Sequence, residues 1–216
     1  NPKTIVVLVS SFPYAINWSQ QNVPAILHMA HAAQEQGTAL GEVLFGDYNP
    51  GGRLNQTWPK SLEQLPPMMD YDLRHGRTYM YFQGEPLYPF GYGLSYTTFE
   101  YSRLRFSSAR LPVKGAVTVS VDVKNTGRRR GDEVVQLYVQ HPQSQVERPR
   151  KELKGFQRIT LEPNEKRTVQ IPLQAEWLGW WNAKEGRFEV EQEPVRIVVG
   201  GSSANARLQK TIHVTR

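Results

Sequence analysis

The chain has 216 residues, enough for one large domain or two small ones. Hydrophobic residues make up 39% and charged residues 21% of it, a composition typical of globular rather than disordered proteins. No apolar run approaches the ~20 residues that cross a bilayer, nothing resembles a signal peptide, and cysteine is absent. We therefore expect no membrane partner, no disulfides and no thiol chemistry.

The net charge of +6 is concentrated in the second half of the chain. Residues 1–96 hold five Lys and Arg against seven Asp and Glu, whereas residues 97–216 hold twenty-one against thirteen. A basic half can bind nucleic acid, but no recognition motif accompanies it. The run Arg128-Arg129-Arg130 lies between two strand-like segments, where a solvated turn is expected. We interpret the charge as that of a basic globular domain and predict no nucleic-acid partner.

The first thirty residues suggest an α/β domain. Residues 4–9 are apolar and β-branched, as in a buried strand of a parallel sheet. The stretch SSFPYAINW after them predicts a loop because it combines Pro with polar residues. The next apolar run, PAILHMAHAA, is helical by propensity, yet Ala25 to Ala30 would also serve as a buried strand.

A helix is clearer in GTALGEVLFGDYNPGG, where Leu40, Val43 and Leu44 share one face and Gly46 stops the helix. The first ~95 residues thus offer two or three strands and one good helix. A parallel sheet needs cover on both faces, and these pieces cannot supply it. We infer that this region is part of a larger α/β domain.

From Arg53 to Phe99 the periodicity breaks down, with five prolines and many aromatic residues. A loop this long is usually functional or disordered, and its aromatic content argues against disorder. After Phe99 the period changes to two. About seven strands occupy ~115 residues, which predicts an antiparallel β-sandwich of the immunoglobulin or fibronectin type III kind. The strand-like runs are YSRLRFS, VTVSVDVKN, EVVQLYVQ, KRTVQIPL, GRFEVEQE, VRIVVGG and LQKTIHVT.

Motifs for metal binding and nucleophilic catalysis are weak. His28 and His31 would share a face only on a helix, and no acidic third ligand follows at motif spacing, so we predict no metal site. Ser10 and Ser11 end the first strand without a surrounding G-x-S-x-G. Carboxylate pairs hydrolyse glycosidic bonds, but the loop carboxylates do not form a recognisable pair. Glu35 could cap the following helix or face a ligand, and we favour the cap.

The stretch MDYDLRHGRTYMYFQGEPLYPFGYG is the best candidate for a ligand site. Arg74, His75 and Arg77 can hydrogen-bond to sugar hydroxyls, and aromatic faces can stack on sugar rings. We predict these three residues as the substrate-binding set. The aromatic residues that follow are expected instead to join two domains; they are Tyr88, Phe90, Tyr92 and Tyr96.

Two long segments resemble the family-three glycoside hydrolases, the β-glucosidases and β-xylosidases. They run from AILHMAHAAQEQG to NPGGRLNQTWP and from RTYMYFQGEPLYPFGYG to TTFEYS. Further on, VKNTGRRRGDEVVQLYV, ELKGFQRITLEPNEKRTV and FEVEQEPVRIVVGGSS are similar to the fibronectin type III-like domain that closes such enzymes. The segment DYDLRHGRTYMYF resembles the xylosidase branch more.

The resemblance implies three domains and a retaining mechanism. A (β/α)8-type barrel carries an Asp nucleophile, an α/β sandwich domain carries the acid/base Glu, and the fibronectin-like domain follows. Neither the barrel nor the usual acid/base segment is recognisable in these 216 residues, so we assign no catalytic residue and expect the chain alone to be inactive. The resemblance also favours a strand over Ala25 to Ala30, with the helix beginning near Gln36.

The predicted fold is an incomplete α/β sandwich domain over residues 1–96, followed by an all-β fibronectin type III-like sandwich over residues 97–216. We expect no cofactor, an oligosaccharide substrate in the complete enzyme, the barrel-bearing portion as partner, and a periplasmic or secreted location. The alternative is a non-catalytic polysaccharide- or protein-binding module. For that module, Trp177, Trp180 and Trp181 could form an exposed stacking strip, although packing on the sandwich is favoured.

Overall fold

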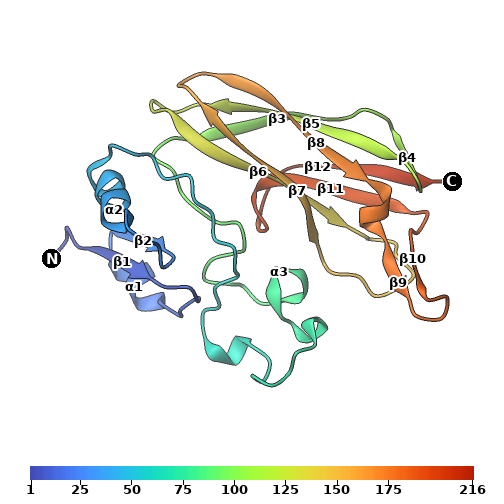
Figure 1. The fold of residues 1–216 in the computed structure, drawn as a ribbon, viewed down its shortest axis with the longest axis horizontal. Coiled ribbons are helices and arrows are strands. Elements are labelled where there is room, and N and C mark those ends of the chain that lie inside the picture. Colours follow the sequence, from blue (N-terminus) through green and yellow to red (C-terminus); the bar gives the residue numbers. More distant parts are fainter.

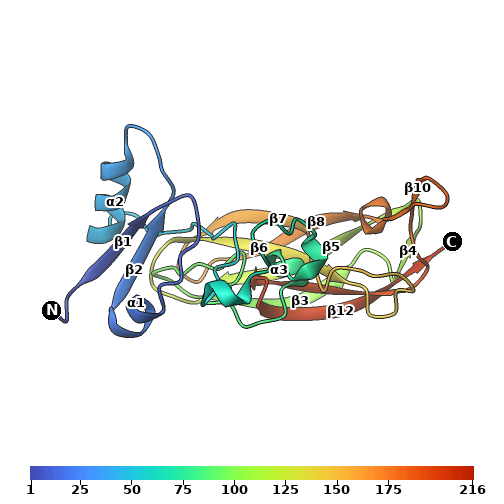
Figure 2. The ribbon, with the colours of Figure 1, turned by 90° about the horizontal axis from the view of Figure 1, so that it is seen from below.

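The computed structural model describes all 216 residues. A small α/β part lies beside a long β-sandwich, and a segment with short helices runs along one side of the sandwich (Figure 1). Seen from below, the α/β part sits at one end of the molecule and the chain ends at the other (Figure 2). The predicted fold class, α/β followed by an all-β sandwich, is confirmed. The boundary between residues 96 and 97 stays a prediction.

The α/β part contains one two-stranded parallel sheet. Strand β1 (Ile5–Val9) pairs with β2 (Ala25–Met29), so the ambiguous apolar run is a strand at this point. Helix α2 (Gln36–Phe45) ends at Gly46, whose φ of 84° is left-handed. The stretch that we predicted as a loop is only partly one, because its last two residues begin helix α1 (Asn17–Asn22). Six residues are too few for a periodic signal.

The α/β part has little core of its own. No residue of β1, β2, α1 or α2 is fully buried, and the side chains Phe12, Trp18 and Phe45 are mostly exposed, Phe45 to 86%. An apolar strand pair normally buries both faces under helices. The large apolar side chains of this part therefore present surface that further protein could cover.

Residues 53–98 contain only short helical turns. These are η1 (Leu62–Gln64), η2 (Leu73–His75) and α3 (Thr78–Tyr81). None of the helices in the structure is both long and apolar enough to cross a membrane. The segment is anchored where Trp58, which is almost fully buried, forms an isolated bridge with Tyr88.

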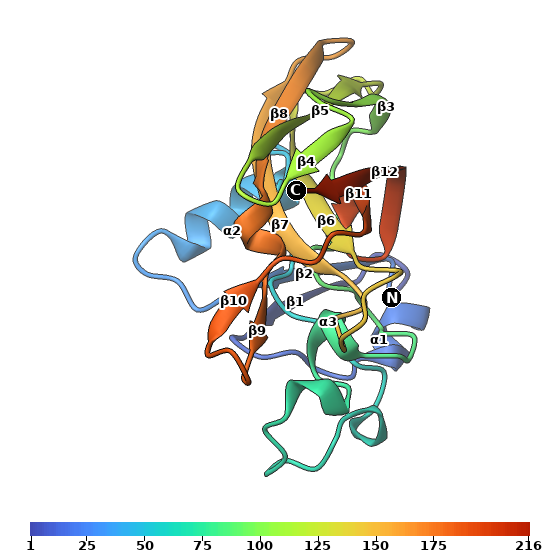
Figure 3. The same ribbon diagram turned by 90° about the vertical axis from the view of Figure 1, so that its right-hand side faces the viewer.

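The sandwich consists of a five-stranded sheet in the order β4-β12-β11-β6-β7 and a three-stranded sheet in the order β3-β5-β8. A small β9–β10 hairpin projects from the end of the sandwich that lies opposite the α/β part and faces the viewer in Figure 3. The bounds are β3 (Phe99–Phe106), β4 (Arg110–Pro112), β5 (Ala116–Asn125), β6 (Gly131–Gln140), β7 (Glu152–Leu161), β8 (Lys166–Gln174), η3 (Ala175–Leu178), β9 (Trp180–Asn182), β10 (Arg187–Glu189), β11 (Pro194–Ser202) and β12 (Asn205–Thr215).

The core lies between the two sheets and holds twenty buried apolar residues. Alternate residues of β5, such as Val119 and Val121, face inward toward residues of β6 such as Val135 and Leu137. Burying each such side chain contributes about 1.5–3 kcal/mol. This alternation is the period-two pattern seen in the sequence.

The predicted strands differ from the observed ones in several places, and the three-residue strands β4 and β9 were not predicted because they are too short for a periodic signal. GRFEVEQE does not join either sheet, since only Arg187–Glu189 is extended and it pairs within the hairpin. Strand β7 was not predicted, because it is an edge strand with Gly155 in its middle and an exposed Phe156 on its surface. A half-covered edge strand does not require clean alternation.

Candidate functional site

An aromatic cluster joins the middle segment to the α/β part and to the sandwich. Tyr88 stacks on Tyr92 with ring centroids 5.4 Å apart, and the edge of Trp58 meets Tyr88 at 5.8 Å. On the sandwich side, Tyr79 stacks on Phe90 at 4.3 Å and accepts a hydrogen bond from the Leu153 amide. We call the residues from 87 to 99 the joint. The rings of Tyr88, Phe90 and Tyr92 pack against other aromatic rings, whereas Tyr96 is partly exposed and its hydroxyl donates to the Val43 carbonyl.

Gly91 lets the joint approach the sandwich closely. Its φ is +80°, and a Cβ at this position would lie 2.1 Å from Gln136 Oε1. Gln136, a buried residue of β6, donates through Nε2 to the carbonyls of Gly91 (3.1 Å) and Gly201 (2.7 Å), and its Oε1 accepts from the Tyr138 hydroxyl. A glycine is therefore required here by both conformation and space.

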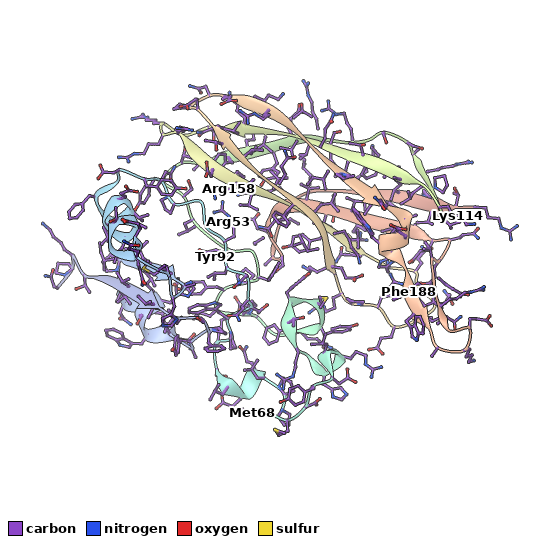
Figure 4. The ribbon with its side chains drawn as sticks, viewed as in Figure 1. Arg53, Met68, Tyr92, Lys114, Arg158 and Phe188 are labelled. Atoms are coloured by element: carbon purple, nitrogen blue, oxygen red, sulfur yellow. The ribbon has the colours of Figure 1, made fainter.

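Polar side chains also cross between the two parts. Arg53 forms an ion pair with Glu133 at 3.2 Å, and both side chains are about nine-tenths buried. Asn49 donates to the Arg130 carbonyl and accepts from the Tyr96 amide at 2.7 Å. Arg53 and Tyr92 both lie between the α/β part and the sandwich in Figure 4. The buried ion pair between Arg53 and Glu133 thus joins the two parts directly.

The predicted site residues lie on a protruding loop, residues 65–77, outside the joint. Met68 marks its tip in Figure 4 and is 87% exposed, and Met69 and Tyr71 are also mostly exposed. A run of exposed apolar side chains on a structured loop is typical of a contact surface.

Arg74 is held by a neighbouring carboxylate. Its guanidinium forms a bidentate ion pair with Asp72 and lies 3.9 Å from Glu147, a residue of the loop that follows β6. The hydrogen bond from Arg74 lowers the pKa of Asp72 far below its usual range, so this carboxylate stays ionised. Asp72 also caps the turn by accepting from the Arg74 amide.

His75 is held in the same way by a second carboxylate. Its Nδ1 lies 2.7 Å from Asp70 Oδ2, and this hydrogen bond raises the pKa of His75 above its ordinary value of 6.5. Nδ1 therefore donates to Asp70, and Nε2 lies 4.0 Å from Asp72 Oδ2 on a side chain that is mostly exposed. The imidazole is oriented and exposed, as a ligand-binding group requires.

Arg77 is used differently from its two neighbours. Its guanidinium donates to the backbone carbonyls of Asp70, Pro67 (2.8 Å) and Met68 (3.3 Å). These bonds tie Arg77 to the other side of the loop. They also supply partners to carbonyls that lie outside regular secondary structure. The structure thus brings Arg74 and His75 together on one short turn and makes Arg77 the support beneath them.

Ser10 and His28 lie within hydrogen-bond distance, which invites comparison with a catalytic pair. His28 Nε2 is 3.2 Å from Ser10 Oγ and 3.1 Å from the Ser10 carbonyl oxygen. Because a carbonyl only accepts, Nε2 must carry the proton and cannot deprotonate the serine. Ser10 Oγ itself donates to the Phe12 carbonyl. The pair is structural and links β1 to β2.

Glu35 occupies the N-cap position of α2, as we favoured, but its carboxylate accepts from the Thr38 hydroxyl at 2.8 Å and from no backbone amide. The three tryptophans do not form one surface. Trp177 packs against the sandwich core, whereas Trp181 is 54% exposed beside the exposed Phe188, 5.2 Å away on the hairpin. The favoured interpretation, packing on the sandwich, thus holds for Trp177 but not for Trp181, and the alternative of a stacking strip is reduced to one exposed pair.

A polar cavity of about 440 Å³ lies between the end of α2 and the start of β6. Asp47 and Asp132 line it. Burial raises the pKa of Asp132, but hydrogen bonds from Thr160 and Arg158 outweigh it, so the net pKa is lowered. A carboxylate held ionised in this way cannot act as a general acid. Beside the cavity, Arg158 Nη2 donates to the Tyr48 hydroxyl at 2.8 Å, and this hydrogen bond joins the α/β part to the sandwich.

Comparison with known proteins identifies the domains. Residues 1–96 match the glycosyl hydrolase family 3 C-terminal domain, and residues 133–203 match the fibronectin type III-like domain. The chain carries the C-terminal domains of glycosyl hydrolase family 3. The family-three resemblance seen in the sequence is thus confirmed.

Relatives of this family-three chain include a periplasmic beta-glucosidase of Salmonella typhimurium and a beta-xylosidase of Formosa agariphila, each 40% identical. The alignments cover 94% and 98% of this chain but only 28% and 30% of the relatives, so the chain spans less than a third of their length. The crystal structure of a Kluyveromyces marxianus beta-glucosidase in complex with glucose is 36% identical and superposes with a TM-score of 0.92, covering all of this chain and 27% of that one.

Proposed function

We propose that this chain forms the C-terminal part of a retaining, exo-acting β-glycosidase, a β-glucosidase or β-xylosidase that removes terminal non-reducing sugars. The observation that carries the proposal is the match over almost the whole chain to family-three enzymes bearing those two names. Retaining hydrolysis requires two carboxyl groups about 5–5.5 Å apart. Because the resemblance puts the nucleophile on a barrel domain, the 216 residues alone should not turn over substrate.

The partner in this proposal is the barrel-bearing portion of the same enzyme. The exposed side chains Phe12, Trp18 and Phe45 of the α/β part support it, because apolar surface of this kind is usually covered. A periplasmic or secreted location is part of the proposal and is supported by the name of the Salmonella typhimurium relative.

An activity assay tests the proposal. The isolated chain is assayed on aryl β-glucoside and aryl β-xyloside, alone and after mixing with a family-three barrel portion. We expect no turnover alone and activity only in the mixture. Turnover by the isolated chain, or failure of the two portions to associate, would contradict the proposal.

Within the complete enzyme we propose that Arg74 and His75 contact the substrate and that Arg77 positions their loop. The fixed orientation of both exposed side chains by Asp72 and Asp70 supports this assignment. In the reconstituted enzyme, Arg74→Gln should raise KM several-fold with little change in kcat. Arg110→Gln, which alters an exposed arginine on β4 that makes no side-chain hydrogen bond, is the control. Equal KM values for the two variants would refute the site but not the enzyme function.

The second candidate function is a non-catalytic module that binds polysaccharide. The exposed Trp181 and Phe188 favour it, because an aromatic face can stack on a sugar ring. Retention of the chain on insoluble glucan or xylan, abolished by Trp181→Ala, would support this function. Passage through both matrices would exclude it.

A further inference from the structure

A second cavity, of about 250 Å³, opens where β6 ends and the loop of residues 141–150 begins. Arg148, Arg150 and Arg196 all line it, and its lining contains no Asp or Glu. We call it the arginine pocket. These three arginines carry like charges, which repel one another unless an anion lies between them, and one guanidinium, that of Arg150, also donates to the Phe82 carbonyl. The volume of the pocket corresponds to roughly eight water molecules, enough for a small ligand.

Arg148 is fixed in place behind the pocket. Its side chain is only 5% exposed, and Nη2 donates to His141 Nε2 at 2.9 Å and to the Leu178 carbonyl at 2.6 Å. The nearest carboxylate reaches it only at 3.9 Å; this is Glu191, which accepts from Ser144 Oγ and from the Gln145 amide. The charge of Arg148 is therefore rigidly placed and not closely neutralised.

His141 does not act as an anion-binding cation here. Because a guanidinium only donates, His141 Nε2 must accept from Arg148, and Nδ1 then donates to Glu193 at 2.7 Å. The ring is thus neutral, in agreement with burial and the neighbouring Arg148, which lower the pKa of His141 to about 4. Oε1 of the nearby Glu193 accepts this hydrogen bond, whereas its Oε2 is buried without a hydrogen-bond partner. Glu193 does not line the pocket.

Arg150 and Arg196 complete the rim from two different elements. The backbone of Arg150 is held at both ends, since its amide donates to the Met80 carbonyl and its carbonyl accepts from Gln140 Nε2. Arg196 lies opposite Gln140 in the β6–β11 register and is exposed, and its side chain makes no hydrogen bond or ion pair. A solvated arginine is common, but here it lies on the same cavity as two ordered ones.

We propose that the arginine pocket binds an oxyanion, either the carboxylate of an acidic sugar or a phosphate group. The planar guanidinium donates two parallel hydrogen bonds to such groups, so arginine recognises them better than lysine does. The site is separate from the loop of Arg74 and His75 and does not depend on the proposed enzyme function.

Calorimetric titration of the chain tests this site, at about 20 mM salt, where screening extends over roughly 20 Å. The probes are inorganic phosphate, glucuronate and glucose, the last lacking only the carboxylate. We expect at least one anion to bind and glucose not to bind. Binding of both anions identifies a general oxyanion site, glucuronate alone an acidic-sugar site, and phosphate alone a phosphoryl site.

Substitution of single arginines shows whether the anion binds in the arginine pocket. Arg196→Gln should weaken anion binding about five- to tenfold without affecting folding, because the side chain has no partner in the structure. Arg110→Gln removes the same charge from an exposed position outside the lining and should leave the affinity unchanged. Absence of binding by both anions, or equal weakening by the two substitutions, would overturn the proposal.

Discussion

Replacing Gly91 by alanine tests the idea that the joint requires a glycine beneath Gln136. The φ of +80° is strained for any residue with a Cβ and costs about 1–2 kcal/mol. The new Cβ would lie 2.1 Å from Gln136 Oε1, so the amide must move and leave the Gly91 and Gly201 carbonyls unpaired. Each buried unpaired group costs about 1–3 kcal/mol. The total loss in the free energy of unfolding should be about 3–8 kcal/mol.

Urea unfolding followed by tryptophan fluorescence measures this loss. Gly186→Ala is the matched control, because Gly186 also has a positive φ, +60°, but no atom lies within 4 Å of its added Cβ. It should lose only about 1–2 kcal/mol. In a Gln136→Ala background the clash is absent, so Gly91→Ala should also fall to about 1–2 kcal/mol. Equal losses for Gly91→Ala and Gly186→Ala in the native background would refute the reasoning.

Three further predictions concern titrating groups. Asp70→Asn should lower the NMR-measured pKa of His75 toward 6.5, because the hydrogen bond that raises it is lost; an unchanged value would contradict the observed contact. His141 Hε1 should show no titration between pH 8 and pH 5, since Arg148 and burial lower its pKa to about 4; a midpoint near 6.5 would disprove the assigned tautomer. Asp122, whose side chain is 4% exposed, is bound by Arg105, Thr168 and Lys166. Burial raises the pKa of Asp122, but these partners outweigh burial, so the net pKa is lowered. The ionised carboxylate therefore stabilises the folded state at pH values above its unfolded pKa, and this stabilisation is lost as the pH falls through its folded pKa. Asp122→Asn should therefore destabilise by about 1–3 kcal/mol at neutral pH, with the difference vanishing well below pH 3.8; a gap that persists in acid would show that packing, not charge, is responsible.

The sandwich was readable from the sequence because its period is local. Val119 and Val121 alternate with exposed residues along a single strand, and each alternate side chain enters one core. The hairpin Trp180 to Glu189 has no such core to face, so GRFEVEQE was wrongly counted among the strands of the sandwich. The run Ala25 to Ala30 was ambiguous because its pairing with β1 lies twenty residues away.

The candidate site was only partly readable for a similar reason. Arg74, His75 and Arg77 are close in the sequence, so their proximity was predictable, but their separate roles depend on which carbonyls and carboxylates the turn brings near. The arginine pocket had a weaker signal. Arg148 and Arg150 stand together, whereas Arg196 joins them only through the antiparallel pairing of β6 with β11.

The sandwich also holds in place the loop that bears the candidate substrate contacts. The backbone amide of Arg150 donates to the Met80 carbonyl, its guanidinium donates to the Phe82 carbonyl, and the Leu153 amide donates to the Tyr79 hydroxyl. Loop 65–77 precedes these residues directly, and its Arg74 faces Glu147 of the sandwich loop. The position of Arg74 and His75 is therefore determined mainly by the β-sandwich rather than by the two-stranded sheet. A displacement of the sandwich would move these side chains even with the α/β part intact.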